Sequence, residues 1–364
     1  MASFGAERSM EFSCIFLSLF VLFSFDQTRA QSVPAMYVFG DSIVDVGNNN
    51  HLPLSIIRAD FPNNGIDYPG KKATGRFSNG KNAADFLAEK LGLSTAPPYL
   101  SQPNSVFVKG VSFASGGAGI FNVTNENLIK HTIPLPHQVG YFSTVRQGLE
   151  KELGSTAVQG HLAKSLFPIV IGSNDIINYF NSDSDASKKS SPQQYVALMV
   201  STLKELLKGL YGLGGRKFLA IGLAPIGCAP KQRFRNITGE CNKEVNYWSN
   251  KYNEGLKQML NEVKAELKEF HYSYLDTYSV FVDFIESPST YGFNETKAAC
   301  CGLGRLRAKL PCTPVSQFCS KRSDHLFWDI YHPTEAAARI FIDIFVNGSG
   351  NYVSPMTLQQ LIAI

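Results

Sequence analysis

The sequence has 364 residues, of which 44% are hydrophobic and 18% are charged, a composition typical of a globular protein with a sizeable core. The formal net charge is only +4, and the basic residues are scattered along the chain. This excludes the clustered positive charge of a nucleic-acid-binding protein, and we expect no nucleic-acid partner.

The N-terminal segment has the features of a secretory leader. Residues 12–25 form an apolar run that is too short to span a bilayer, and small residues occupy the −3 and −1 positions of a cleavage site after Ala30. We therefore predict a signal peptide at residues 1–30. A signal anchor is the alternative, because Arg8 lies between acidic residues. No other apolar run is long enough to cross a membrane, so we expect no stable membrane insertion of the mature chain.

Short apolar runs alternate with segments of helical periodicity after the leader. The apolar runs predict strands, and the periodic segments predict helices. Strands alternating with helices imply a parallel sheet that is covered on both faces. We predict a single α/β domain at residues 31–364, a three-layer α/β/α sandwich around a five-stranded, mostly parallel, flavodoxin-like sheet. The predicted strands are 34–39, 105–113, 166–171, 217–223 and 272–275; the predicted helices are 81–91, 138–153, 192–211, 244–270 and one starting near Pro333; long loops are predicted at 48–77 and 287–327.

Polar, glycine-rich sequence follows three of these strands. The first ends in Gly-Asp-Ser at residues 40–42, the second in SGGAG at 115–119, and the third in GSND at 172–175. In open α/β sheets the ligand site lies beyond the carboxyl ends of the strands. We therefore expect these three segments to meet at one edge of the sheet.

These segments contain the groups that acyl transfer requires. The Ser42 hydroxyl needs an oriented histidine as its base, and His332 has the most suitable context of the seven histidines. Asp329 precedes it by three residues, and a proline then begins a helix. The backbone N–H groups of Ser42 and Gly116 and the side-chain amide of Asn174 are candidate donors to an oxyanion.

Each segment also has a purely structural interpretation. Gly-Asp-Ser forms turns in many proteins, and the glycines at 116–119 fit any loop that needs unusual dihedrals. Asn174 and Asp175 could cap the following helix, and Asp329 could be a local cap beside a surface histidine. The three segments and the C-terminal motif have to be considered together.

Together, the stretches FGDSIVDVGNNN, GVSFASGGAG, IGSNDIINYF and LFWDIYHPTEAA resemble the four signature blocks of the GDSL family of serine esterases and lipases, the SGNH hydrolases. The order and spacing of the blocks are also similar. GRFSNGKNAADFLAEKLGL, LAPIGCAP and the cysteine pattern that begins CCGLG resemble the plant secreted branch of this family. The resemblance spans essentially the whole mature chain.

The resemblance implies an SGNH hydrolase fold and a role for each matching residue. Ser42 would be the nucleophile and an oxyanion donor, His332 the base, and Asp329 the group that orients it. Gly116 and Asn174 would complete the oxyanion hole, with the adjacent Gly117 as the alternative to Gly116.

The resemblance also implies a small-molecule or polymeric ester substrate, no metal or organic cofactor, and an extracellular address in the apoplast or cell wall. Ile43 and Ser112 depart from the family pattern, which has leucine and asparagine there; the second change alters a supporting hydrogen bond. The G-x-S-x-G elbow of the α/β-hydrolases is absent from the sequence.

One stretch fits a different motif. Residues 75–81, GRFSNGK, match the phosphate-binding pattern G-x-x-x-x-G-K, but Asn82 follows where the magnesium-binding Ser or Thr would stand. No apolar strand precedes it. We expect an ordinary loop that leads into a helix, with Arg76 and Lys81 solvated.

The cysteines and glycosylation sequons agree with an extracellular protein. Cys14 leaves with the signal peptide, and an even number of cysteines remains, which predicts disulfides. The pairing is open; we predict Cys228 with Cys241, and the other four closing residues 291–322 on themselves. CxxC and HExxH are absent, which argues against zinc. Surface N-glycosylation is predicted at the sequons Asn122, Asn236, Asn294 and Asn347.

Three functions remain open from the sequence. The first is a secreted serine esterase or lipase that hydrolyses carboxylic esters through an acyl-enzyme. The second is an acyltransferase, in which an alcohol intercepts the acyl-enzyme. The third is an inactive secreted glycoprotein that binds lipid or sugar on the same fold. The oligomeric state stays undetermined.

Overall fold

The computed structural model describes residues 33–102, 105–125, 131–181, 184–347 and 352–364. Residues Val33–Ile364 form one compact unit. The predicted signal peptide lies outside the described residues, as does the serine of the Asn347 sequon.

The central sheet has six strands in the order β2-β1-β3-β4-β5-β8. The first five are parallel, and their order is that of a flavodoxin-like sheet, as predicted. The sixth, β8, is antiparallel to β5 at the edge and has only two residues, too few to leave a pattern in the sequence. The strands are β1 (Met36–Gly40), β2 (Gly110–Ser112), β3 (Leu166–Val170), β4 (Lys217–Ile221), β5 (His271–Leu275) and β8 (Val353–Ser354).

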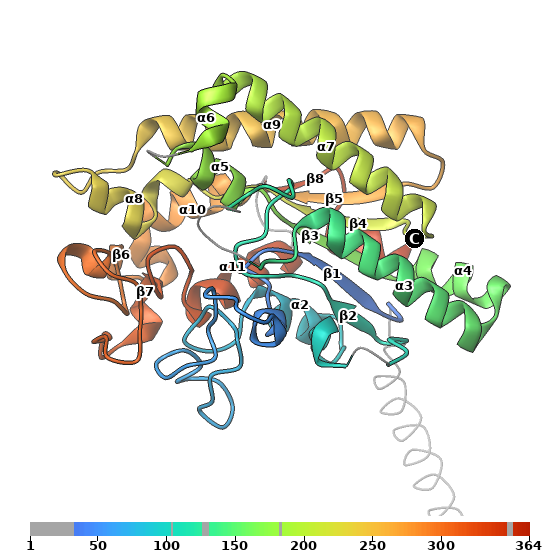
Figure 1. Cartoon of the computed structure of the whole chain (residues 1–364), viewed down its shortest axis with the longest axis horizontal. Helices are drawn as coiled ribbons and strands as arrows, with labels where there is room; N and C mark the ends of the chain where they lie inside the picture. Colours follow the sequence, from blue (N-terminus) through green and yellow to red (C-terminus); the bar gives the residue numbers. More distant parts are fainter. Residues whose placement is uncertain (1–32, 103–104, 126–130, 182–183, 348–351) are drawn as a thin grey trace, which may run out of the picture. The chain divides into compact units, whose positions relative to one another are not determined.

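Helices cover both faces of this sheet (Figure 1). Helices α3, α4, α7 and α9 pack on one face, whereas α2, α10, α11 and α12 pack on the other. The helices are α2 (Ala83–Lys90), α3 (Leu135–Leu153), α4 (Ser155–Lys164), α5 (Ser173–Tyr179), α6 (Asp185–Lys189), α7 (Pro192–Gly212), α8 (Pro230–Arg235), α9 (Lys243–Glu266), α10 (Thr277–Glu286), α11 (Glu335–Asn347) and α12 (Leu358–Ala363).

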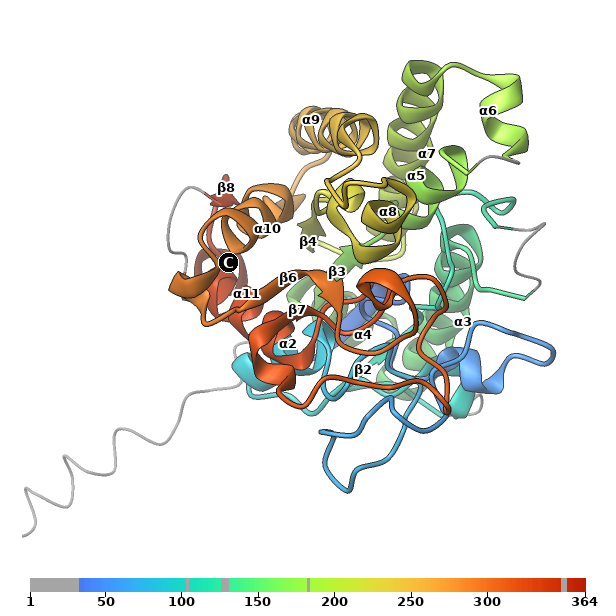
Figure 2. The same cartoon turned by 90° about the vertical axis from the view of Figure 1, so that its left-hand side faces the viewer.

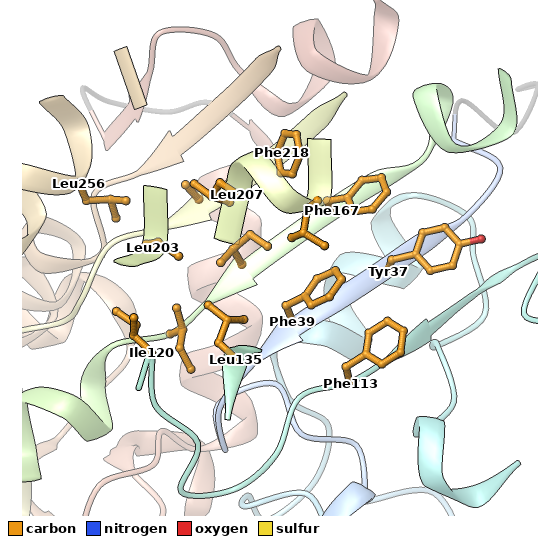
Figure 3. Packing of buried hydrophobic residues seen from close by; sticks show 14 of the residues in the cluster. Tyr37, Phe39, Phe113, Ile120, Leu135, Phe167, Leu203, Leu207, Phe218 and Leu256 are labelled. Carbon is orange, nitrogen blue, oxygen red and sulfur yellow. The ribbon is translucent and has the colours of Figure 1, made fainter. Parts of the chain in front are cut away.

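The alternation of side chains along each strand builds two separate cores. On β1, Tyr37 and Phe39 face α3, and Met36 and Val38 face the opposite layer. Figure 3 shows the first core, in which the rings of Phe39 and Phe167 stack with centroids 6.4 Å apart. Because both faces of every central strand are buried, the strands are apolar throughout, which is the pattern that made them recognisable.

A proline lies in the middle of the central strand β3. Pro168 is the third of its five residues. Proline has no N–H to donate, and the β1–β3 pairing accordingly passes from Leu166 to Ile169 without pairing Pro168.

The loop predicted at 287–327 contains a small second sheet. Strands β6 (Glu295–Ala299) and β7 (His325–Phe327) pair in parallel, and two disulfides close the segment between them. The disulfides are Cys228–Cys241, Cys300–Cys319 and Cys301–Cys312. The predicted local pair and the predicted closure of the other four cysteines within one segment are both confirmed.

Candidate active site

The three polar strand ends lie on neighbouring strands. Since β2, β1 and β3 are adjacent, the segments that follow them meet at the carboxyl edge of the sheet. Ser42, Gly117 and Asn174 from these segments line one pocket together with His332 and Asp329. The C-terminal motif is brought to this edge by the segment between β7 and α11.

Ser42, His332 and Asp329 form a continuous chain of hydrogen bonds. The Ser42 Oγ lies 2.7 Å from His332 Nε2, and His332 Nδ1 lies 2.8 Å from both carboxylate oxygens of Asp329. An imidazole protonated at Nδ1 donates to Asp329, so that Nε2 accepts the serine hydroxyl. Asp329 Oδ1 also accepts the backbone N–H groups of Tyr331 and His332, which fixes the carboxylate.

Burial and charge act against each other in this chain. Burial lowers the pKa of His332, but the charge of Asp329 and its hydrogen bond outweigh burial and hold that pKa above its usual value. Burial raises the pKa of Asp329, yet the charge of His332 and the hydrogen bonds that the carboxylate accepts keep it below its usual value. The arrangement therefore favours the ion pair that a proton transfer from Ser42 would create.

A second buried carboxyl faces the same histidine. Asp41 is 1% exposed, and burial raises its pKa to about 7, although the N–H of Ile43 and the charge of His332 lower it. The charges of the two groups interact, because protonated His332 lowers the pKa of Asp41 and ionised Asp41 raises that of His332.

Phe77 packs against the imidazole. The ring centroids of Phe77 and His332 are 5.0 Å apart, with a tilt of 32°. A Cβ at Gly116 would lie 2.5 Å from the Phe77 ring, so only glycine fits at this position. Glycine at 116 therefore makes room for the aromatic ring beside the histidine.

Contrary to expectation, the backbone N–H of Gly116 is not free to bind an oxyanion. This group donates to the buried carboxylate of Asp45 over 3.0 Å, and the pocket is lined by Gly117 instead. Within the described part of the chain, the N–H groups of Ser42 and Gly117 have no hydrogen-bond partner. Gly117, with φ of 81°, is the better candidate for the second backbone donor.

Asn174 and Asp175 act across the sheet edge and do not cap their own helix. The Asn174 amide donates to the carbonyl of Ala118 over 2.9 Å, which leaves its second N–H for a ligand. The Asp175 carboxylate accepts the N–H of Ile120 and the hydroxyl of Thr124. Both side chains hold the loop after β2 in place.

The run of three asparagines at 48–50 joins the loop that follows Ser42 to its neighbours. Asn48 donates to the carbonyls of Ser112 and Ala114, and Asn49 donates to the carbonyl of Gly116. The hydroxyl of Ser112, where we expected an altered hydrogen bond, is buried without a partner among the described residues. The contact from Asn48 goes to the backbone carbonyl of Ser112 and does not involve its side chain.

Sequence reasoning did not identify Gln138 of α3. Its buried amide accepts the N–H of Gly40 over 2.8 Å and donates to the carbonyl of Gly40 over 2.8 Å and that of Ile133 over 2.7 Å. Gly40 ends β1 two residues before Ser42. The sequence signal that could have identified it is a polar residue on the face of a predicted helix that packs against the core.

The GRFSNGK stretch was partly misinterpreted. It does lead into α2, which Asn82 caps. Arg76, however, is not solvated: it is 6% exposed and makes a bidentate ion pair with Asp85 at 2.7 and 2.8 Å. Lys81 pairs with Glu89. Both cations of the supposed phosphate loop therefore already have carboxylate partners.

The predicted glycosylation sites lie at the surface. Asn122, Asn294 and Asn347 are exposed, and Asn236 is half-buried. No helix among the described residues is long and apolar enough to cross a membrane.

The site and the sheet together define an α/β/α sandwich with a Ser–His–Asp chain at the carboxyl edge of its strands. Residues 36–345 match the family model of the GDSL-like lipases/acylhydrolases. The chain belongs to this family, whose members are carboxylic ester hydrolases.

Relatives match along nearly the whole chain. GDSL esterase/lipase At5g55050 of Arabidopsis thaliana is 48% identical, covering 96% of this chain and 98% of the relative. GDSL esterase/lipase At3g50400 of the same plant is 39% identical, covering 97% and 99%. Among solved structures, the acetylxylan esterase Axe2 of Geobacillus stearothermophilus matches with a TM-score of 0.38 and 14% identity, covering 85% of this chain and 90% of that one.

Proposed function

We propose that the protein is a secreted serine esterase or lipase that works through an acyl-enzyme. The observation that carries the proposal is the 2.7 Å contact between Ser42 Oγ and His332 Nε2, continued to Asp329. This is the geometry in which a serine hydroxyl can be activated by a general base.

In the first half-reaction, Ser42 Oγ attacks the ester carbonyl while its proton passes to His332 Nε2. The N–H groups of Ser42 and Gly117 and the amide of Asn174 bind the oxyanion. His332 then returns the proton to the departing alcohol, and the acyl group stays on Ser42. Water, deprotonated by His332, releases the acid by the same steps in reverse.

A Ser42→Ala variant tests this mechanism directly. We expect hydrolysis of p-nitrophenyl acetate to fall by about 10³-fold or more, because no other group can form the acyl-enzyme. Labelling by a p-nitrophenyl alkylphosphonate should occur in the wild type and disappear in the variant. Full activity in the folded variant would refute the proposal. Phosphonate labelling without hydrolysis would redirect it to transfer of the acyl group to an alcohol.

Secretion is proposed from the leader and the disulfides together. Three disulfides in the described chain fit an oxidising compartment, and the relatives are plant proteins. We expect the protein from plant cell-wall fluid to begin at Gln31 when its N-terminus is sequenced. Recovery of the chain with its first 30 residues attached to membranes would instead indicate a signal anchor.

A further inference from the structure

The pocket at Ser42 continues well beyond the reactive groups. It encloses about 630 Å³, which is within the usual range for small-molecule sites. Its wall includes Val38 of β1, Pro168 of β3 and Leu219 of β4, which alternate onto the same face of the sheet. The pocket therefore extends along the face of the sheet that α2, α10 and α11 cover; this is the space beneath the sheet.

The opposite wall is formed by the helices that cover this face. Phe281 of α10 and Phe341 and Ile342 of α11 line the pocket, as does part of α2. Figure 2 shows α2, α10 and α11 lying close together. Among the described residues, the side chains that the sheet and these three helices contribute to the lining include no charged one. Apart from the hydroxyl of Thr277, which is buried without a partner among the described residues, this lining is apolar and favours an apolar ligand.

The reach of the pocket can be estimated from the sheet. Ser42 follows β1, and α10 follows β5, which is three strands away in the order β1-β3-β4-β5. With strands about 4.8 Å apart, this distance is about 14 Å. Since three bonds of an extended chain span about 3.5 Å, roughly a dozen bonds fit between Ser42 and the α10 side of the pocket.

From this geometry, and resting on the proposed function, we infer that the space beneath the sheet is the binding site for the acyl chain of the substrate. The substrate class is an ester of a linear fatty acid of about ten to twelve carbons or more, whose carbonyl lies at Ser42 and whose chain runs between the sheet and α10 and α11. The alcohol part stays outside this apolar space, and the cations that line other parts of the pocket are Arg58, Lys231 and Arg235.

The test is a series of p-nitrophenyl esters from acetate to palmitate, each kept below its micelle concentration. In the wild type kcat/KM should rise about three- to fourfold per added methylene, the value of burying one methylene, until the pocket is full. Alkylphosphonates of the same lengths, which label Ser42, should show the same rise in their labelling rates. A flat profile alongside good acetate hydrolysis would overturn the acyl site and leave the esterase intact. Loss of activity and labelling with every length would refute the esterase itself.

Two variants locate the site. Ala224 follows β4, is half-buried and lines the pocket, so Ala224→Phe should obstruct it. We expect kcat/KM for dodecanoate to fall at least tenfold while acetate changes less than twofold. Ala186→Phe, at a half-buried alanine that packs with the opposite core, is the matched control and should leave the profile unchanged. Equal losses on acetate and dodecanoate in Ala224→Phe would contradict the inference.

The second variant enlarges the pocket. Phe281→Ala removes an aromatic ring from the wall, and we expect the preferred chain length to increase by at least two carbons. Phe284→Ala, on the same helix, removes another buried ring that does not line the pocket. A shift of the preferred length in the Phe284 variant, or none in the Phe281 variant, would place the acyl chain elsewhere.

Discussion

At the scale of single residues, His332 has two acidic neighbours with different states. Asp329 is fixed by its hydrogen bonds and stays ionised, whereas burial raises the pKa of Asp41 to about 7. A base that must accept a proton from Ser42 is useful only when it is neutral. In the proposed mechanism, the raised pKa of His332 therefore sets the lower pH limit of activity.

We expect kcat/KM on a soluble ester to fall as the pH drops through an apparent pKa that lies above that of a free histidine. The sign follows from the raised pKa, because His332 stays protonated to higher pH than a free histidine and cannot accept the proton. In Asp329→Asn, burial acts on His332 without the opposing charge. The apparent pKa should then fall, and kcat should drop by about 10⁴-fold.

The matched control for this pH profile is Asp324→Asn. Asp324 contacts a different histidine, His325, at 2.7 Å through the same pair of atom types. Its removal should leave the profile unchanged. If Asp329→Asn also left the acid limb where it was, another group would be responsible for that limb, and Asp41 would be the next residue to test.

At the scale of elements, helix α3 holds the end of β1 through one side chain. Gln138 satisfies both backbone groups of Gly40, and a Cβ at Gly40 would lie 2.4 Å from the carbonyl oxygen of Val170. Asn253 of α9 makes the same two-way contact with Leu223 after β4, at 2.7 and 2.9 Å. The turn that presents Ser42 thus depends on a helix outside the motif.

Gln138→Leu is expected to lower the free energy of unfolding by about 2–4 kcal/mol, because buried backbone groups lose their partners. It should also lower kcat for acetate about tenfold or more, since Ser42 is no longer held within reach of His332. Urea unfolding and steady-state kinetics measure the two effects.

Asn253→Leu is the control that separates the positioning of Ser42 from the stability of the fold. It should destabilise the protein by a similar amount and leave kcat for acetate close to the wild-type value. If both variants lowered kcat equally, Gln138 would be a stabilising residue without a role in positioning Ser42.

At the scale of the whole molecule, two disulfides stabilise the segment that leads to Asp329 and His332. Cys300 and Cys301 donate their N–H groups to the carbonyls of Phe327 and Trp328, directly before Asp329. Trp328 is fully buried against these cysteines. The cysteine-rich segment, which looks peripheral in the sequence, therefore supports the aspartate that contacts His332.

Replacing both Cys300 and Cys319 by serine should lower the free energy of unfolding by about 2–4 kcal/mol, since the unfolded chain gains the entropy of an open loop. It should also reduce activity, because Asp329 becomes less well held. Removal of Cys228 and Cys241, which close a shorter loop and in which Cys228 donates its N–H to Pro225, should destabilise with less effect on activity. Unchanged unfolding of the first variant would show that the bond does not constrain the chain.

The sequence by itself determined the features that repeat locally. Apolar runs on two-sided strands and periodic helices were enough for the five parallel strands and their layers. Four motifs were enough to nominate Ser42, Asp329 and His332, and cysteine spacing indicated the pair Cys228–Cys241. The two-residue β8 and helix α10 were not predicted; α10 is rich in β-branched and aromatic residues that favour strands.

Only the tertiary structure decided matters that depend on partners far apart in the chain. Asp45 takes the N–H of Gly116, 71 residues away, so Gly117 and not Gly116 faces the pocket. Arg76 is buried because it forms an ion pair with Asp85. Gln138 accepts a hydrogen bond from Gly40, which lies 98 residues earlier in the chain. Buried polar groups form hydrogen bonds with whichever partners the fold brings close, and local sequence does not encode that proximity. The extent of the apolar pocket beneath the sheet depends on the same packing.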